Sequence, residues 1–381
     1  MILLILKEKL KNGLSIVEKI TGKNLNLPIL NNVLITTSKN FLNLNTTDLE
    51  IAIRYWILTK VEKQGKMVIP VKFLSNLISL LPNEKLILEE KNKTLYINYK
   101  NSESFIKGGN VDDFPIIPKI ETENFIEINN KSFCCGLAQV VDFTTPTQVR
   151  PELSGIYFNF EKTQLSLVAT DSFRLAEKKI SLKSSSLEKE KGYSFILPQK
   201  AARELINVLL EKDGKLKIYP SPTQVLFEFP MQEVSHPEFQ LISRLIEGEY
   251  PNYKEIIPQK YKTKVILPKN DFLNQIKTAG LFAGKINEVQ IKVDLEKKGM
   301  EVSSKNPELG ENKSFIPCQV EGKEVKASFN FRYLVDGILN LNSNSKNSEI
   351  VFELNGEEGP AVLKTIDDPN YIYIAMPIKN S

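Results

Sequence analysis

The chain repeats one pattern of hydrophobic and polar residues at a distance of 123 positions. Residues 42–53 read LNLNTTDLEIAI and residues 165–176 read LSLVATDSFRLA. Each segment alternates apolar and polar residues before and after a Thr-Asp pair, which is typical of two antiparallel strands that are each buried on one face. Aspartate tolerates turn conformations and accepts hydrogen bonds from its own backbone, so the Thr-Asp pairs at 47–48 and 170–171 are predicted turns.

Helical spacing recurs twice in each third of the chain. Apolar residues at i, i+4 and i+7 predict a first helix from three stripes: Leu10, Leu14 and Val17; Phe133, Leu137 and Val140; Phe272, Ile276 and Ala279. A second helix is predicted from three further stripes: Leu74, Leu77 and Leu81; Ala202, Leu205 and Leu209; Phe331, Leu334 and Ile338. Gly13 and Gly136 occupy the same place in the first two helices, which predicts close packing there. Each third is therefore expected to be one α+β unit.

The length of 381 residues exceeds one ordinary core, since a domain averages roughly 150 residues. Proline-rich segments at 114–125 and 250–262 divide the chain, and we predict three domains, at residues 1–122, 123–259 and 260–381. Residues 181–192 are polar and lack periodicity, which predicts a mobile surface loop.

Composition excludes several classes of protein. The chain is 41% apolar and 25% charged, as a globular protein is, and it has no apolar run near the roughly 20 residues of a membrane helix. The apolar start MILLIL lacks a basic flank and a cleavage site, so we expect a first strand, no membrane partner and a cytoplasmic protein. The net charge of only +4 means that any nucleic acid must be met by a local patch.

Catalytic chemistry has few candidate residues. Three cysteines, two of them adjacent at Cys134 and Cys135, form neither a disulfide framework nor a metal motif. The only histidine, His236, is expected to be a loop residue, which argues against Ser-His-Asp and Cys-His catalysis. Walker, dinucleotide-binding and zinc-protease motifs are absent from the sequence. We therefore expect no catalytic residue, no cofactor and no metal site.

Three tandem units and four short segments together resemble the bacterial DNA polymerase III beta subunit family, the sliding clamps. The segments are LPILNN at 27–32, residues 165–176, ISRLIEGEYPNY at 242–253 and MPIK at 376–379. The resemblance covers the whole chain. It implies three related clamp domains with helices inside and antiparallel sheets outside, joined head to tail in a homodimeric ring around double-stranded DNA. It also implies a non-enzymatic processivity factor for DNA replication whose partners are the replicative polymerase, the clamp loader and other proteins with a clamp-binding motif.

Elementary helix geometry is compatible with such a ring. Twelve helices at ~9.5 Å between neighbouring axes lie on a circle ~36 Å across. Subtracting a helix diameter of ~10 Å leaves a hole of ~26 Å, which admits a duplex ~20 Å wide.

Basic residues on the polar faces of the helices are candidates for attracting DNA phosphate without reading bases. These residues are Lys7, Lys9, Lys11, Lys19, Lys72, Lys131, Lys200, Arg203, Lys269, Lys277 and Arg332. By position in the family, the resemblance implies DNA contacts at Asn24, Lys72 and the segment 147–152, which includes Thr147, Arg150, Pro151 and Glu152.

The resemblance further implies a groove for partner peptides between the second and third domains. Its residues are Leu153, Thr170, Ser172, Phe173, Arg174, Leu175, Pro251, Ile256, Pro360, Ile374 and Met376. Aliphatic walls, an adaptable methionine and a few polar atoms suit a short peptide, whereas the alternative interpretation is an ordinary core beneath a hairpin. Phe173, Glu255 and the ending after Lys379 depart from the usual family residues, which predicts a shifted peptide preference.

Phe105, Leu281 and Phe282 match the family's dimer interface and stand beside small or polar neighbours. They could instead complete the core of each domain.

Two alternative functions remain open. Asp48 and Asp171 could serve a carboxylate-dependent metal phosphohydrolase. The chain could also be a monomeric repeat scaffold that binds peptides and no DNA.

Overall fold

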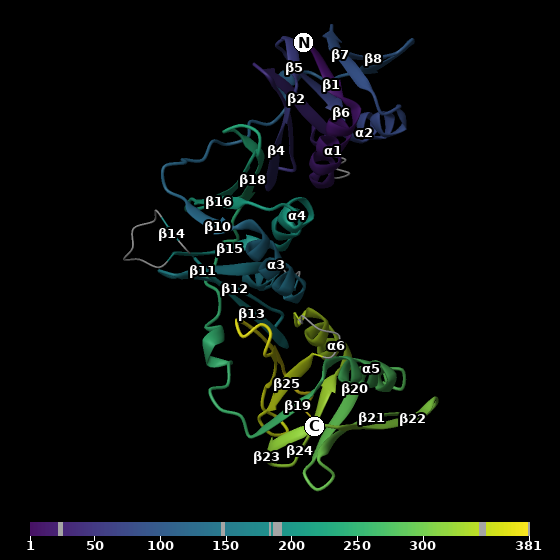
Figure 1. The fold of residues 1–381 in the computed structure, drawn as a ribbon, viewed down its shortest axis with the longest axis vertical. Helices are drawn as coiled ribbons and strands as arrows, with labels where there is room; N and C mark the ends of the chain where they lie inside the picture. Colours follow the sequence, from purple (N-terminus) through teal and green to yellow (C-terminus); the bar gives the residue numbers. More distant parts are fainter. Residues whose placement is uncertain (22–25, 146–148, 183, 186–192, 343–347, 380–381) are drawn as a thin grey trace. The chain divides into compact units, whose positions relative to one another are not determined.

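Each third of the chain folds into the same set of elements in the computed structural model (Figure 1). The structure describes residues 1–21, 26–145, 149–182, 184–185, 193–342 and 348–379. Within these residues, each third contributes nine strands and two α-helices. The chain forms two compact units, of which the first comprises Met1–Cys135, Leu182–Lys191 and Lys200–Ile246, and the second Gly136–Ser181, Gly192–Gln199 and Glu247–Ser381.

The first unit contains two antiparallel sheets. One has the order β5 (Lys60–Lys63), β1 (Ile2–Leu6), β7 (Lys85–Lys91), β8 (Thr94–Tyr99), β9 (Ser102–Lys107). The other has the order β14 (Ser184–Ser185), β10 (Ile126–Asn129), β16 (Lys215–Pro220), β17 (Gln224–Pro230), β18 (Pro237–Arg244), β4 (Ile51–Leu58), β3 (Phe41–Thr47), β2 (Asn32–Ser38), β6 (Lys66–Pro70). Of the predicted loop at 181–192, two residues form β14, while residues 183 and 186–192 lie outside the described part of the chain.

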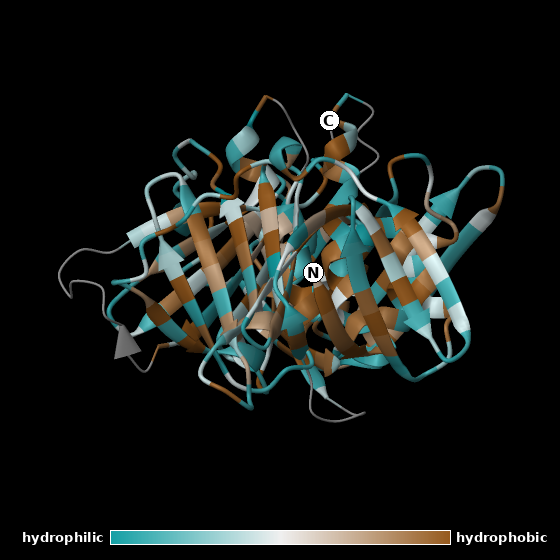
Figure 2. Ribbon diagram, turned by 90° about the horizontal axis from the view of Figure 1, so that it is seen from above, coloured by the Kyte–Doolittle hydropathy of each residue, from teal (hydrophilic) through white to brown (hydrophobic). Residues whose placement is uncertain are grey.

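The second unit also contains two antiparallel sheets. One has the order β15 (Tyr193–Pro198), β11 (Gly155–Phe160), β12 (Gln164–Thr170), β13 (Arg174–Ser181), β27 (Tyr371–Ala375), β26 (Ala361–Thr365), β25 (Glu349–Leu354), β19 (Thr263–Pro268), β23 (Gln319–Gly322). The other has the order β22 (Gly310–Pro317), β21 (Gly299–Asn306), β20 (Glu288–Asp294), β24 (Val325–Asn330). Hydrophobic and hydrophilic residues alternate along many of these strands (Figure 2), as expected for sheets with one face in the core.

The six α-helices of the described residues start directly after strands. They are α1 (Lys7–Val17), α2 (Val71–Leu80), α3 (Asn130–Val140), α4 (Gln199–Leu209), α5 (Lys269–Gly280) and α6 (Phe331–Asn340). Pro70, Pro198 and Pro268 immediately precede α2, α4 and α5, where a missing amide hydrogen costs nothing. None of the helices in the described segments is long and apolar enough to cross a membrane.

The predicted apolar stripes are confirmed in α1, α3, α4 and α5, while α6 has Leu334 and Ile338 buried but Phe331 only half-buried, and α2 shows one exchange. All nine residues of the first-helix stripes are fully buried. In α2, Ile78 is buried in the place predicted for Leu77, which is only half-buried. The reason is that Val71, Leu74 and Ile78 follow a spacing of three and four residues that keeps them on one face.

Gly13 and Gly136 allow two helices to lie close to a sheet, as predicted. A Cβ on Gly13 would lie 2.7 Å from Cδ1 of Ile57 on β4, and a Cβ on Gly136 would lie 2.8 Å from Cδ1 of Ile180 on β13. The two isoleucines are again 123 residues apart. The same close contact therefore recurs in the first and second thirds.

The strand order is identical in the three thirds. The five-stranded set runs β5-β1-β7-β8-β9, β14-β10-β16-β17-β18 and β23-β19-β25-β26-β27. The four-stranded set runs β4-β3-β2-β6, β13-β12-β11-β15 and β22-β21-β20-β24. Within each unit, one five-stranded set and one four-stranded set join into a nine-stranded sheet, because β4 pairs with β18 and β13 pairs with β27. The corresponding strands β9 and β22 have no neighbour on one side among the described residues.

Candidate functional site

The two predicted turns have the same hydrogen bonds. Oδ1 of Asp171 accepts from the backbone N–H groups of Phe173 and Arg174, at 3.0 and 2.9 Å, and Oδ1 of Asp48 accepts from the two equivalent groups. The third turn residue has a left-handed backbone in both, with φ of 78° at Leu49 and 77° at Ser172. The turn role of the aspartates is thus confirmed, and each turn reverses the chain so that the following residues pair with the preceding strand.

Arg174, the cationic residue of the predicted groove, is held by two carboxylates and two aromatic rings. Its Nε donates to Oδ2 of Asp171 at 2.8 Å, and its Nη1 donates to Oδ2 of Asp336 on α6. Its guanidinium carbon lies 5.1 Å from the ring centre of Phe143 and 4.7 Å from that of Tyr333. Burial lowers the pKa of Arg174, but Tyr373, Asp336 and Asp171 outweigh this and hold the pKa above its ordinary value.

Phe173 is exposed where the resemblance places the groove. Its side chain is 58% exposed and its ring stacks on Tyr333, with centroids 6.4 Å apart. Tyr333 and Asp336 were not predicted from the sequence. They lie on one face of α6 at a spacing of three residues, but the sequence pattern contained no signal that this face meets the turn at 170–174.

The C-terminal strand lies directly beside this turn. In the pairing of β13 with β27, Arg174 is opposite Ala375 and Leu175 is opposite Ile374. The backbone N–H of Met376 then donates to the Phe173 carbonyl at 2.8 Å. The structure therefore brings together the segment 172–175 with Ile374 and Met376, where Leu175 and Ile374 are buried and Phe173 and Met376 reach the surface.

The remaining groove residues are held by links to the same strands. Leu153 is buried in the short 3-10 helix Pro151–Ser154, next to Arg150, whose Nη1 donates to Oγ of Ser172 at 3.4 Å. Between Pro251 and Ile256, the hydroxyl of Tyr253 donates to Glu177 on β13 at 2.8 Å. Thr170 uses its hydroxyl to bond the Arg174 carbonyl. Pro360 directly precedes β26, which pairs with β27.

The predicted DNA contacts occupy different environments. Lys72 is exposed on α2 and Arg203 is exposed on α4. Lys200 is also exposed, but its Nζ pairs with Oδ2 of Asp48. Arg150 pairs with Glu152 at 3.1 Å beside Pro151. Asn24 and Thr147 lie outside the described residues.

Two lysines of the wider basic set are less exposed than the others, since Lys7 is buried and Lys269 is half-buried. The Lys7 side chain is 7% exposed and pairs with Glu8 at 2.9 Å. Nζ of Lys269 donates to the Leu341 carbonyl at 2.6 Å, and burial lowers the pKa of Lys269. Both stand at the first position of a helix. Their burial and their bonds make them less available to phosphate than the exposed lysines, and their role at DNA stays a prediction.

Two of the three residues predicted at the dimer interface are exposed, and Phe282 is half-buried. Phe105 on β9 is 64% exposed, and Leu281, just after α5, is 73% exposed. A Cβ on Gly310, the first residue of β22, would lie 4.0 Å from Phe282. Phe105 and Leu281 therefore do not complete a domain core, and the set lies at or beside the two strands that have an unpaired side. Phe315 on β22, which is 42% exposed, is a further residue of this kind that the sequence analysis missed.

The two turn aspartates are poorly suited to hold a metal ion. Asp171 binds two backbone N–H groups and Arg174, and Asp48 binds two backbone N–H groups and Lys200. In the described part of the chain, no group of three or more histidine, cysteine, aspartate or glutamate side chains could hold a metal ion.

Comparison with known proteins covers nearly the whole chain. Residues 1–118, 127–252 and 254–379 match the family profiles of the N-terminal, central and C-terminal domains of the DNA polymerase III beta subunit. The beta sliding clamp of Staphylococcus epidermidis is 30% identical over 364 residues, which are 93% of this chain and 92% of that protein. The chain belongs to the beta sliding clamp family.

Other sliding clamps show the same correspondence in sequence and fold. The beta sliding clamp of Bacillus subtilis is 27% identical over 98% of both chains. The crystal structure of the DNA polymerase sliding clamp from Bacillus subtilis matches all of this chain and all of its own with a TM-score of 0.92. The sliding clamp of Pseudomonas aeruginosa has the same fold, with a TM-score of 0.91 at 21% identity.

Proposed function

We propose that two copies of this chain close head to tail into a ring around double-stranded DNA and tether the replicative polymerase to it. The observation that carries the proposal is the repeated strand order. Two of the three five-stranded sets end in a strand that pairs with the end strand of a four-stranded set, as β18 does with β4 and β27 with β13. The strands β9 and β22 are the corresponding pair, and each has an open side in the described residues. Pairing β9 of one copy with β22 of another removes both edges.

The side chains on these two strands suit such a contact. β9 carries Glu103, Phe105 and Lys107, and β22 carries Glu311, Lys313 and Phe315. Each edge therefore offers one charge of either sign and one exposed aromatic ring, and an antiparallel register with Lys107 opposite Glu311 pairs opposite charges there and places Phe105 opposite Lys313. In this assembly the three predicted domains, 1–122, 123–259 and 260–381, occur twice.

DNA is held by enclosure, supported by weak contacts to phosphate. Lys72 is exposed on α2, and Lys200 and Arg203 are exposed on α4. Such side chains attract a phosphate backbone without reading sequence, so binding to linear DNA is expected to be weak and salt-dependent.

Partner proteins bind through the groove formed by the segment 172–175, Ile374, Met376 and the neighbouring residues. Phe173 and Ile256 offer exposed apolar surface, at 58% and 43% exposure. The replicative polymerase, the clamp loader and other proteins with a clamp-binding motif are the proposed occupants. Tethering requires no catalytic chemistry, so the protein is proposed to act as a processivity factor and not as an enzyme. Its proposed location is the cytoplasm.

The decisive experiment uses topology. A bacterial clamp loader places the protein on nicked circular DNA, and the retained protein is measured by gel filtration before and after the circle is cut. The protein is expected to stay on the closed circle and to leave the linear product. Retention on linear DNA would contradict enclosure, and phosphodiester turnover with Mg²⁺ would favour the hydrolase alternative. A monomer that binds peptides but is never retained on the circle would favour the scaffold alternative.

A further inference from the structure

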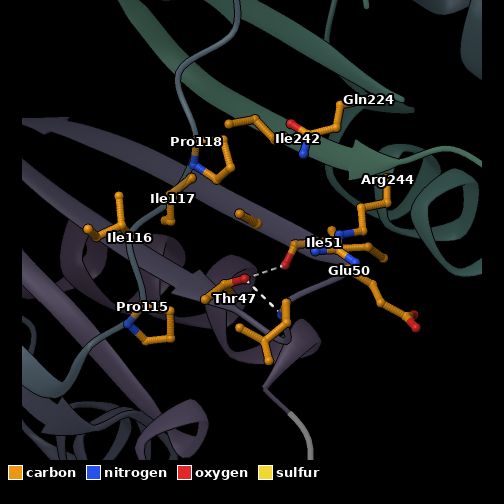
Figure 3. Close-up of a pocket in the computed structure, with 12 residues that line it drawn as sticks. Thr47, Glu50, Ile51, Pro115, Ile116, Ile117, Pro118, Gln224, Ile242 and Arg244 are labelled. Carbon is orange, nitrogen blue, oxygen red and sulfur yellow. Dashed lines mark hydrogen bonds between the residues drawn. The ribbon is translucent and has the colours of Figure 1, made fainter. Parts of the chain in front are cut away.

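A cavity of about 190 Å³ opens beside the first Thr-Asp turn, within the first compact unit (Figure 3). Its wall combines the turn itself, the extended segment 115–118 and the end of β18. Ile51 and Ile242 are buried in its floor, Ile117 is half-buried and Ile116 is 94% exposed at the rim. The cavity is therefore an apolar hollow with a solvent-exposed aliphatic edge.

By the 123-residue repeat, the position of this cavity in the first unit corresponds to that of the proposed partner groove in the second unit. Ile242 is opposite Ala52 in the pairing of β18 with β4, as Ile374 is opposite Leu175 in the pairing of β27 with β13. The residue two places after each of these isoleucines also repeats its backbone hydrogen bond. Arg244 N–H donates to the Glu50 carbonyl at 2.9 Å, and Met376 N–H donates to the Phe173 carbonyl at 2.8 Å. The same backbone arrangement thus occurs twice with different side chains.

The turn at this cavity presents a bulky apolar residue in a strained backbone conformation. Leu49 has φ of 78° and is 46% exposed, whereas its counterpart Ser172 is small. A non-glycine residue in the left-handed region costs on the order of 1 kcal/mol, and such residues cluster at ligand sites. Leu49 and Ile116 together give two exposed aliphatic contacts at the rim.

The charge at this cavity differs from that at the groove. Arg174 in the groove is neutralised by Asp171 and Asp336, whereas Arg244 is exposed and has no carboxylate at ion-pair distance in the described chain. Figure 3 shows the Arg244 side chain directed toward Ile51 and the Glu50 carboxylate directed away from the isoleucines. A cation beside aliphatic walls is complementary to a ligand with a carboxylate next to aliphatic side chains.

We propose that this cavity is a second peptide site, which takes a short extended segment of a partner protein with one acidic residue beside aliphatic anchors. The analogy with the partner groove rests on the proposed function, while the cavity, its exposed isoleucine and its unpaired arginine do not. A partner with two linked segments then engages both sites of one chain, so that a weak second contact strengthens the whole.

The test follows isoleucine methyl signals of the full-length protein by NMR during titration with acetyl-Asp-Leu-Ser-Ile-Leu-amide. The signals of Ile51, Ile116, Ile117 and Ile242 are expected to shift and to saturate together. Replacing the peptide Asp by Asn, or Arg244→Gln in the protein, is expected to weaken binding about fivefold, as for an exposed charge pair. Ile116→Ser is expected to weaken it further without unfolding, since that side chain is 94% exposed. The matched control Ile366→Ser, at a side chain 70% exposed in the other unit, is expected to leave it unchanged.

Three other outcomes would contradict the proposed second peptide site. Shifts confined to Ile256 and Ile374 would place the peptide in the partner groove alone, which leaves the proposed function intact. Shifts of the cavity isoleucines on concentrating the protein without peptide would make a second copy the occupant. The absence of any shift at millimolar peptide would exclude peptide binding at this cavity, whereas polymerase stimulation tests the proposed function separately.

Discussion

Nε of Arg174 and Oδ2 of Asp171 are joined by a hydrogen bond of 2.8 Å that closes the turn at 170–174. Both side chains are largely buried, at 14% and 13% exposure. Removing one partner of a buried ion pair leaves an uncompensated charge, so Arg174→Met is expected to lower the free energy of unfolding by about 2–3 kcal/mol. Arg174→Lys is expected to restore less than half of this, because lysine lacks the planar fork.

Urea denaturation at fixed protein concentration measures this effect. The matched control is Arg150→Met, which removes a more exposed ion pair with Glu152 and is expected to change stability by no more than about 0.5 kcal/mol. Equal stability of the two variants would show that the Arg174 ion pairs contribute nothing net.

Replacing Leu281 and Phe282 together by alanine is expected to give a folded monomer. These side chains lie beside the open edge of β22, and their loss removes apolar surface from the proposed dimer contact. Sedimentation at micromolar concentration and circular dichroism report the mass and the fold. Ile366→Ser, another exposed apolar position, should remain dimeric. A wild-type protein that sediments as a monomer at this concentration would exclude the ring.

Changing Lys72 and Lys200 together to glutamate is expected to reduce loading and processive synthesis at least tenfold at moderate salt. Both side chains are exposed, so the fold should persist, and the lost Lys200 pair with Asp48 costs about 1 kcal/mol or less. Primer extension on a long template measures processivity. Lys162→Glu with Lys323→Glu makes the same change in charge in exposed segments outside the helices. If this control loses as much activity, net charge rather than position is responsible.

Met376→Glu is expected to abolish polymerase stimulation while leaving the dimer intact. The side chain reaches the surface beside Phe173, and a carboxylate there places an unpaired charge against the apolar anchor of a partner peptide. Polymerase pull-down and primer extension provide two readouts. Normal stimulation by this variant would show that the groove is misplaced. Deletion of residues 375–381 is a less specific test, because Ala375 pairs with Arg174 and the Ile378 N–H donates to the Ser328 carbonyl.

Gly13→Val is expected to destabilise the protein by about 2–3 kcal/mol. A Cβ at this position already lies 2.7 Å from Cδ1 of Ile57, and two further methyl groups enlarge the clash. The double variant Gly13→Val with Ile57→Ala should recover part of the loss, since it frees the space. Thermal unfolding of the four proteins gives the coupling between the two positions. Purely additive losses would show that the close contact is not what requires glycine.

Local patterns in the sequence determined the parts of this protein that depend on neighbours along the chain. The Thr-Asp turns were predicted because aspartate bonds its own backbone, and the helical stripes because one buried face repeats every 3.6 residues. The repeat itself located Gly13 and Gly136. The three tandem units and four short segments in the right order were sufficient to indicate the family, because each segment carries its own residues and its own place in the chain.

Tertiary structure alone decided which surfaces meet. Alternation shows that β4 and β13 each bury one face, but it does not show that their edges pair with β18 and β27 from the next third of the chain. For the same reason, Tyr333 and Asp336 could not be assigned to Arg174, and the burial of Lys7 could not be foreseen. Periodicity reports that a face is buried or exposed. The partner on the other side comes from a distant segment, and only the folded backbone brings the two together.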